Sequence, residues 1–362
     1  MLEPFIIRSH DVCVLRYPGK QEFCSLLDLV SWDNSAFQDF YARNMKQIIA
    51  GHRKYASDYE KKRTSELILE LQGKAAPYIL QRSMKEHFKG KLPGKDEFVV
   101  LVKPSEKQWN ISKRFMGSDL VQHFKDSGSR FHAFAAIARL IMIAYHPYFA
   151  EQQTDANVQE YLSSLKANHD DGSELDMDNV LSDEGGVHDN DYLKSSNQFI
   201  EILRDSPKLR MCKDLLVNLV QNKHKILVFA GYRKPLDFLA HVLQHSNIGY
   251  YRVDGPTSQG KRDTYISEFN SKKSRHQIML VTKGAGGLGL TLTGADRVII
   301  LEPSWNPSVD AQAVGRAFRI GQTRRVEVYR ILTAGLIEEK ASTLVTKRCF
   351  FFQVEVCRKK FI

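Results

Sequence analysis

The fold of this chain is decided by the stretch Gln277-Ile-Met-Leu-Val-Thr-Lys-Gly-Ala-Gly-Gly-Leu-Gly-Leu-Thr-Leu-Thr-Gly-Ala-Asp-Arg-Val-Ile-Ile-Leu301. In it, two short apolar runs flank a glycine-rich turn. Similar runs occur at 225–230, 250–253 and 326–332, and helical segments lie between most of them. Short apolar strands that alternate with helices predict a parallel sheet covered on both faces. The predicted fold class is therefore α/β, and ligands of such sheets gather at the carboxyl ends of the strands.

The segment before this alternation has a mainly helical pattern. Apolar residues recur at helical spacing in 35–49 and 65–80, and 130–145 is an amphipathic pattern that His146-Pro147 ends. One strand is predicted within this segment, at Glu97-Phe-Val-Val-Leu-Val.

Composition places the chain among ordinary soluble globular proteins of two or three domains. It has 362 residues, of which 43% are hydrophobic and 26% charged. No run approaches the roughly 18 apolar residues needed to cross a bilayer, and no secretory signal is readable, so no membrane partner is predicted. The five cysteines form no CxxC pair. The sequence therefore predicts reduced thiols in an intracellular protein, with no metal site and no disulfide framework.

The net charge of +10 is unevenly distributed along the chain. Residues 151–197 hold twelve Asp and Glu but two Lys, which leaves 50 Lys and Arg against 30 Asp and Glu elsewhere. The acidic segment is predicted to be disordered, because its composition cannot bury enough apolar surface to fold. The basic remainder favours a polyanion partner through counterion release from phosphates, and a merely soluble basic protein stays the alternative.

The glycine-rich turn from Lys283 to Gly294 has two interpretations. Glycine permits a close backbone approach, and a turn of this kind after a strand can aim N–H groups at a phosphate. A simple tight turn is the alternative. The turn is not a Walker A loop, because no Gly-Lys-Ser/Thr follows at the required spacing.

A second motif is Asp310-Ala-Gln-Ala-Val-Gly-Arg-Ala-Phe-Arg-Ile-Gly-Gln322. Its spacings of four and three would stack Gln312, Arg316 and Arg319 on one face of a helix. Guanidinium groups fork onto phosphate oxygens, although a solvated basic face is the alternative. Trp305, between two prolines just upstream, is either a packing wedge or a ligand contact.

Taken in order, these motifs closely resemble the C-terminal RecA-like lobe of superfamily-two helicases, and more narrowly the Swi/Snf-type DNA-translocating ATPases. The carrying pattern is AGGLGLTLT, ADRVI, P.WNP and D.QA..R..RIGQ. The excision-repair, Cockayne-syndrome-type branch is the most similar. The resemblance covers 206 to about 340, and a weaker one covers roughly 25–149. It predicts an N-terminal remnant (1–24), a helical protrusion and linker region (25–150), an acidic disordered linker (151–197), a helicase C-terminal RecA-like lobe (198–346) and a divergent tail (347–362).

The resemblance also implies roles for individual residues. In such motors ATP, with Mg²⁺, lies between two lobes, and double-stranded DNA runs across both. Arg316 and Arg319 would be arginine fingers, which contribute on the order of a thousandfold in rate. The nucleotide site would further include Gly287, Gly289 and Gln312. Contacts to the DNA backbone are implied for Gly231, Gly255, Lys283, Gly286, Trp305 and Asn306.

The sequence departs from the family pattern in three places. Ala230 stands where a serine is usual, which puts that phosphate contact in doubt, and Lys283 replaces a usual Ser or Thr. The resemblance is lost after about residue 340, which suggests a truncated or alternatively spliced end or a gene-model artefact. The 362 residues also contain neither a Walker A motif nor an Asp-Glu-x-His box. A first ATP-binding lobe is therefore expected to be absent.

The expected function is the C-terminal portion of an ATP-dependent double-stranded-DNA translocase of chromatin remodelling or DNA repair. It is expected in the nucleus, with nucleosomes or repair complexes as partners, no small-molecule substrate besides ATP, and no hydrolysis on its own. Whether the chain by itself is an enzyme stays open. The alternatives are a non-catalytic DNA- or partner-binding module, such as a truncated isoform, and the second lobe of an RNA helicase, against which Trp305-Asn-Pro and Arg319-Ile-Gly-Gln argue.

Overall fold

The computed structural model describes residues 43–44, 46–48, 50–51, 56–75, 92–118, 121–122, 130–151, 196–286, 290–304 and 307–348. The chain divides into two compact units, Met1–Lys91 and Leu92–Ile362. The predicted remnant 1–24, most of the acidic segment and the end of the tail lie outside the described residues. No helix in the described part is long and apolar enough to span a bilayer.

The first unit contains helix α3 (Asp58–Ala75), which covers much of the helix predicted at 65–80. Ser57 and Glu60 exchange two hydrogen bonds at the start of the helix. The Ser57 N–H donates to Glu60 Oε2 at 2.7 Å, and the Glu60 N–H donates to Ser57 Oγ at 3.2 Å. This reciprocal pair is a capping box, which satisfies N–H groups that the first turn leaves without helical partners. Leu67 is buried on the inner face of the helix.

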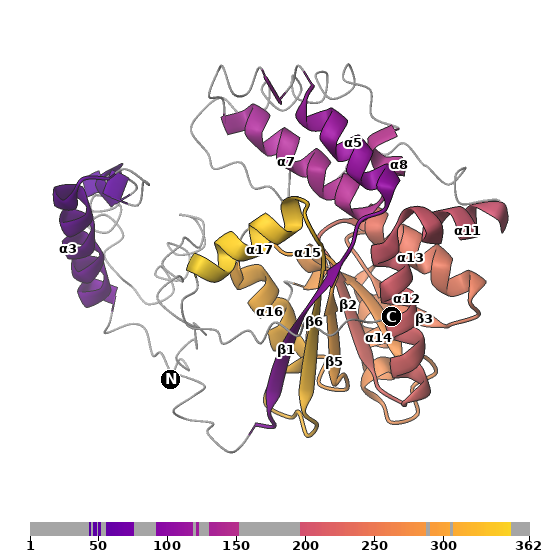
Figure 1. The fold of residues 1–362 in the computed structure, drawn as a ribbon. Coiled ribbons are helices and arrows are strands. Elements are labelled where there is room, and N and C mark those ends of the chain that lie inside the picture. The colour runs from indigo at the N-terminus through magenta and orange to yellow at the C-terminus, as the bar shows by residue number, and fades with distance from the viewer. Residues whose placement is uncertain are drawn as a thin grey trace. The chain divides into compact units, whose positions relative to one another are not determined.

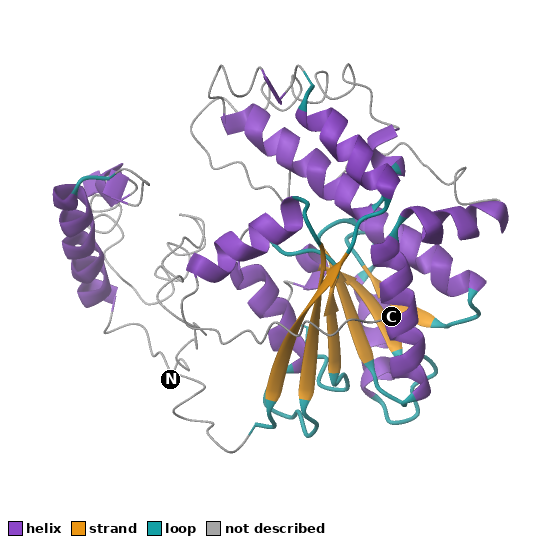
Figure 2. Ribbon diagram, in the orientation of Figure 1, coloured by secondary structure: helices purple, strands orange, loops and turns teal. Residues whose placement is uncertain are grey.

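The second unit is built on one six-stranded sheet, in the order β1-β6-β5-β2-β4-β3, and every neighbouring pair is parallel (Figure 2). The strands are β1 (Lys95–Val102), β2 (Ile226–Ala230), β3 (Tyr250–Val253), β4 (Ile278–Thr282), β5 (Arg297–Ile300) and β6 (Val326–Thr333). Each lies on an apolar run identified in the sequence. The prediction of an α/β fold with a RecA-like parallel sheet is confirmed.

The helices of this unit connect and cover the strands (Figure 1). They are α5 (Glu106–Met116), α7 (Arg130–Tyr145), α8 (Tyr148–Glu151), α11 (Ser196–Asp205), α12 (Pro207–Gln221), α13 (Arg233–His245), α14 (Gln259–Asn270), α15 (Lys283–Gly286), α16 (Pro307–Ala317) and α17 (Ile337–Arg348). The helix predicted at 130–145 has the bounds of α7. Figure 1 shows α5 and α7 beyond the carboxyl ends of the strands.

Side-chain alternation along the strands builds a separate core on each face of the sheet. On one face, Val228 of β2 packs in a cluster with Leu216 of α12 and Leu236 of α13. On the other face, Phe229 packs in a cluster with Phe269 of α14 and residues of α16. Burial of each such side chain contributes about 1.5–3 kcal/mol, which is why the strands read as continuous apolar runs.

Strand β1 joins this sheet although it lies more than 120 residues before β2 in the sequence. It pairs with β6 along its full length, from Lys95 opposite Val326 to Val102 opposite Thr333. The following helix is fixed by Gln108, whose amide donates to the carbonyls of Ile143 and Ala144 at 3.0 and 2.9 Å. Residues from Leu92 onward thus share one compact unit with the predicted helicase lobe.

Cys212 is the free cysteine among the described residues, and it is fully buried in α12. Burial raises the pKa of its thiol to about 12. A thiol with such a pKa stays protonated at neutral pH, so Cys212 acts as a packing residue.

Candidate nucleotide and nucleic-acid site

The residues for which DNA contacts were predicted cluster, where described, at the carboxyl edge of the sheet. Gly231 follows β2, Gly255 follows β3, and Lys283 and Gly286 form the ends of the short helix α15 after β4. Trp305 and Asn306 lie outside the described residues. Gly255 is exposed with open space around it, and its carbonyl accepts a hydrogen bond from Arg262 at 3.1 Å. The edge therefore offers bare backbone at Gly255.

The Lys283 ammonium group is directed into the protein. Its side chain is 2% exposed, and Nζ lies 2.9 Å from Asp310 Oδ1 and 2.9 Å from Ser304 Oγ. The ammonium also donates a hydrogen bond to the main-chain carbonyl of Glu302. Two hydrogen bonds and one ion pair within the protein therefore surround this charge. In this arrangement Lys283 ties the start of the glycine-rich segment to the N-terminal part of α16.

The Lys283–Asp310 pair is part of a chain of ion pairs that continues to β1, the edge strand of the sheet. Asp310 also accepts from Arg330 Nη1 at 2.9 Å, and Arg330 Nη2 lies 3.1 Å from Glu97 on β1. Burial opposes ionisation of Asp310, but the charges of Lys283 and Arg330 outweigh it and hold the pKa of this carboxyl below its ordinary value. Asp310 was not among the predicted site residues, although an acidic residue in the first turn of a helix is a signal for a basic partner.

Glu302 is a second buried carboxylate at this edge, and the sequence analysis gave it no role. It lies at the exit of β5, and its Oε1 accepts a hydrogen bond from the Gly231 N–H. The other carboxylate oxygen, Oε2, has no hydrogen-bond partner among the residues that the structure describes. Burial raises the pKa of Glu302 above its ordinary value, and the nearby Lys283 charge only partly offsets this effect. The Gly231 N–H is therefore already engaged within the protein.

Helix α16 ends at Ala317, so the prediction that one helical face carries Gln312, Arg316 and Arg319 is wrong for Arg319. The chain turns after the helix because Gly321 adopts a φ of +99°, a conformation that residues with a Cβ rarely take. Gln312 and Arg316 remain on the helix, where Gln312 is exposed and Arg316 is half-buried. Arg319 lies in the turn, and its Nη1 donates to Thr291 Oγ1 at 3.1 Å.

Gln322 holds this turn in place, a role that the sequence analysis did not assign. Its side chain is buried, and Nε2 lies within hydrogen-bond distance of the carbonyls of Thr293, Ala295 and Ala317. Its Oε1 accepts from the N–H groups of the next two residues, at 3.0 and 2.9 Å. One amide thus closes the end of α16 and fixes it to the segment that follows the glycine-rich turn.

The two arginines accordingly lie beside the far end of the glycine-rich segment. The Leu292 N–H donates to the Arg316 carbonyl at 3.0 Å, next to the Thr291 contact of Arg319. Gly287 and Gly289, which precede these residues, lie outside the described residues. In the described part, no group of three or more His, Cys, Asp and Glu side chains is arranged to hold a metal ion. The Lys283–Asp310 ion pair therefore lies near the start of α16, and Arg316 and Arg319 lie at and just beyond its end.

Comparison with known proteins identifies the family of the chain. Residues 207–321 match the family described as helicase conserved C-terminal domain. SNF2 domain-containing protein ENL1 of Oryza sativa subsp. japonica is 35% identical over 84% of this chain and 30% of its own length. Protein CHROMATIN REMODELING 24 of Arabidopsis thaliana is 34% identical over 81% of this chain and 26% of its own length. DNA excision repair protein ERCC-6-like of Danio rerio is 34% identical over 69% of this chain and 16% of its own length.

The chain thus spans less than a third of the length of these relatives. A solved structure, the C-terminal part of the Fun30 ATPase domain, aligns with a TM-score of 0.48 and 24% identity over 70% of this chain and 90% of that one. The motif order, the parallel sheet and the family match agree with one another. Residues 207–321 are therefore a helicase conserved C-terminal domain, and the chain is a member of the SNF2 family, whose relatives act in chromatin remodelling and DNA repair.

Proposed function

We propose that this chain supplies the second RecA-like lobe of an ATP-dependent double-stranded-DNA translocase that acts in the nucleus, in chromatin remodelling or DNA repair. The names of its relatives support this assignment, since they include a chromatin remodelling protein and an excision repair protein. ATP with Mg²⁺ would be held mainly by a Walker A-containing lobe, and this chain would contribute the arginines. Nucleosomes or repair complexes would be the assemblies on which it works.

The observation that carries this proposal is the connection between α16 and the glycine-rich segment. Arg316 and Arg319 each have a direct hydrogen bond to residues 291–292, one through the main chain and one through the side chain. The Gln322 amide closes the same junction. The hydrogen bond to Thr291 holds the Arg319 guanidinium, and such preorganisation is what stabilisation of charge on a transferring phosphoryl group requires. The main-chain bond of Arg316 fixes its backbone beside the same segment. Gly287, Gly289 and Gln312 would complete the nucleotide-facing surface.

The DNA track of the proposal lies along the carboxyl edge. Gly255 and Gly286, with Trp305 and Asn306, are its proposed backbone contacts, which would provide affinity without sequence preference. Gly255 fits this role best, because it is exposed and no atom of the described residues lies within 4 Å of the position that a Cβ would take. The Gly231 N–H donates to Glu302 Oε1, which supports an internal role for that group. The buried ammonium of Lys283 supports an internal role for that residue instead of a phosphate contact.

The test combines the purified chain with a separately purified SNF2-type lobe that carries Walker A. We expect DNA-stimulated ATP hydrolysis from the mixture and none from the chain alone. Substitution Arg316→Ala or Arg319→Ala should lower the rate by on the order of a thousandfold, whereas nucleotide binding by the other lobe should not change. Hydrolysis by the chain alone would contradict the division of roles.

If both arginine variants leave the rate of the mixture unchanged, the assignment of arginine fingers fails. Binding of duplex DNA that persists in that case would favour the second candidate, a non-catalytic DNA-binding module. A preference for structured RNA over duplex DNA would instead favour an RNA helicase lobe.

A further inference from the structure

Exposed positive charge in the second unit gathers on the edge of the sheet opposite the proposed DNA track. The loops 222–225, 271–277 and 318–325 enter β2, β4 and β6 at the amino edge. Together they contain eight Lys and Arg and no Asp or Glu. At the carboxyl edge, by contrast, the loops 103–105, 231–232, 254–258, 301–306 and 334–336 hold one cation, Lys103, and the carboxylates Asp254 and Glu302. Two further cations at this edge are paired with carboxylates: Arg233 with Asp254, and the buried Lys283 with Asp310. The basic surface and the predicted track are therefore different surfaces.

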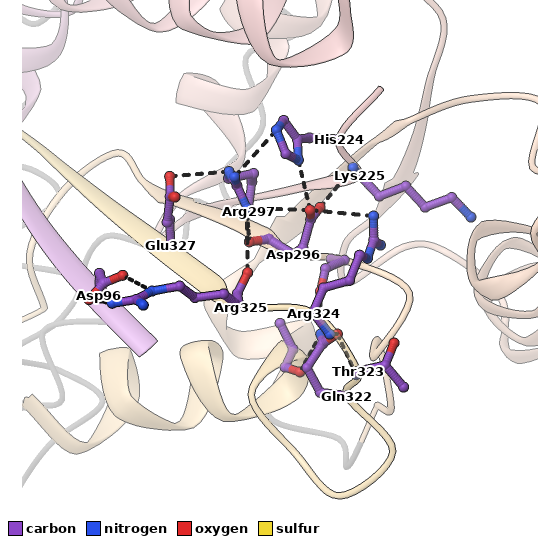
Figure 3. Close-up of polar contacts among 12 residues, drawn as sticks. Asp96, His224, Lys225, Asp296, Arg297, Gln322, Thr323, Arg324, Arg325 and Glu327 are labelled. Carbon is purple, nitrogen blue, oxygen red and sulfur yellow. Dashed lines mark hydrogen bonds and ion pairs between the residues drawn. The ribbon is translucent and has the colours of Figure 1, made fainter. Parts of the chain in front are cut away.

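The three basic loops form one continuous structure. Lys225 Nζ donates to the carbonyls of Phe269 and Ser271, which joins the first loop to the second. The Lys225 N–H donates to Asp296 Oδ1 at 3.1 Å, and Arg324 Nη1 lies 3.3 Å from Asp296 Oδ2, which joins the first loop to the third. Figure 3 shows His224, Arg297 and Arg324 converging on this carboxylate.

Asp296 is 4% exposed and pairs with Arg324, and Asp96 of β1 pairs with Arg325, so these two carboxylates offset part of the positive charge. Beyond these pairs, Lys272, Lys273 and Arg275 are exposed, and Arg324 keeps 43% of its side chain exposed. Burial lowers the pKa of Lys225, and repulsion from the Arg324 charge lowers it further. Like charges held this close favour a bound anion that relieves their repulsion.

The character of the surface identifies the class of anion. Apart from Ile320, the exposed residues of the three loops are polar or glycine. Protein partners are usually anchored by buried aromatic and aliphatic side chains, and the loops offer almost none. A phosphate backbone requires only cations and polar donors, and interfaces with DNA are more polar and more positively charged.

We propose that the amino-edge patch, formed by Lys223, Lys225, Lys272, Lys273, Arg275 and Arg324, is a second binding surface for the backbone of duplex DNA. It lies on the opposite edge of the sheet from the proposed track, so the chain contacts DNA on two sides. Two such surfaces on one lobe let it hold two separate segments of duplex, or two turns of one bent duplex. This inference extends the proposed function and does not depend on the arginine fingers.

The test measures binding of the full chain to a mixed-sequence duplex of about 30 base pairs as a function of salt concentration. The patch variant is Lys272→Gln/Lys273→Gln/Arg275→Gln, whose positions are exposed and outside the proposed nucleotide and DNA sites. The control variant Lys61→Gln/Lys62→Gln/Arg63→Gln removes two Lys and one Arg that are exposed on α3, in the first compact unit. Both variants therefore change the net charge equally, and thermal unfolding by circular dichroism checks that both fold.

We expect the patch variant to bind at least tenfold more weakly near physiological salt, and its plot of log K against log salt to be shallower by about two to three, because each phosphate contact contributes about 0.9. The control should stay close to wild type. Equal weakening of both variants would overturn the proposal, because binding would then follow net charge alone. An unchanged patch variant would overturn it as well, and patch-dependent binding of polyglutamate in that case would identify an acidic protein partner. If wild type itself does not bind duplex DNA, the proposed function fails too, whereas patch-independent binding removes only the second surface.

Discussion

Replacement of Lys283 by methionine separates an internal ion pair from a DNA contact. Methionine keeps much of the volume of the side chain but removes its charge, so Asp310 loses the partner at 2.9 Å. Breaking a buried ion pair typically costs about 3–5 kcal/mol. Asp310 keeps Arg330 at 2.9 Å and the Ser304 N–H at 3.2 Å, which retain part of its stabilisation. We therefore expect Lys283→Met to lower the free energy of unfolding by about 2–3 kcal/mol.

The assay pairs urea unfolding with the salt dependence of duplex binding, measured where both proteins are folded. The matched control is Lys261→Met, because Lys261 is exposed on α14, whose first turn lies at the same edge of the sheet. The control should change the free energy of unfolding by less than about 0.5 kcal/mol. Lys283→Met should leave the salt slope unchanged. A slope reduced by about one with stability intact would refute the reasoning, since that is the signature of a phosphate contact.

Three further substitutions test other contacts. Glu302→Gln should stabilise the protein at neutral pH. Burial raises the pKa of Glu302, so this carboxyl favours folding below pH 4.5, its ordinary pKa, and loses that contribution as the pH rises. In unfolding curves, the stability advantage of the Gln variant should therefore shrink on acidification. Lys208→Met should cost about 3–5 kcal/mol, because it leaves Glu338 buried without its partner, and adding Glu338→Leu should recover most of that loss in chemical denaturation. Gly294→Ala should lower the melting temperature, since its Cβ would lie 2.9 Å from the Asn270 Cα; an unchanged value would show that the backbone there yields easily.

The sheet was predictable because its signal is local. Strands buried on both faces must be apolar at nearly every position, so 225–230, 250–253 and 277–282 are recognisable from residue type alone, and the observed strands begin within one residue of these bounds. The family is equally local, since it is carried by short motifs in a fixed order. The end of the helix at 130–145 was predictable because Pro147 follows it after one intervening residue.

The end of α16 was not predictable from spacing. The helical spacing in the sequence continues through Arg319, but α16 ends at Ala317. The positive φ of Gly321 and the buried Gln322 amide, which donates to the Ala317 carbonyl, turn the chain there. The Gln322 side chain bonds to the carbonyls of residues 293 and 295, almost 30 positions away, so helical spacing alone could not predict this end of the helix. Backbone groups that must be satisfied by distant partners decide such boundaries.

By itself, the sequence determined the α/β class, the six apolar strands and the SNF2-type motifs, because hydrophobic burial and turn chemistry act over a few residues. Only the tertiary structure decided where the charges are placed. It brought Asp310 to Lys283 across 27 positions and so buried an ammonium group that the sequence suggested for phosphate. It also gathered three basic loops, up to about 100 residues apart, at one edge of the sheet, because parallel strands all begin on the same side.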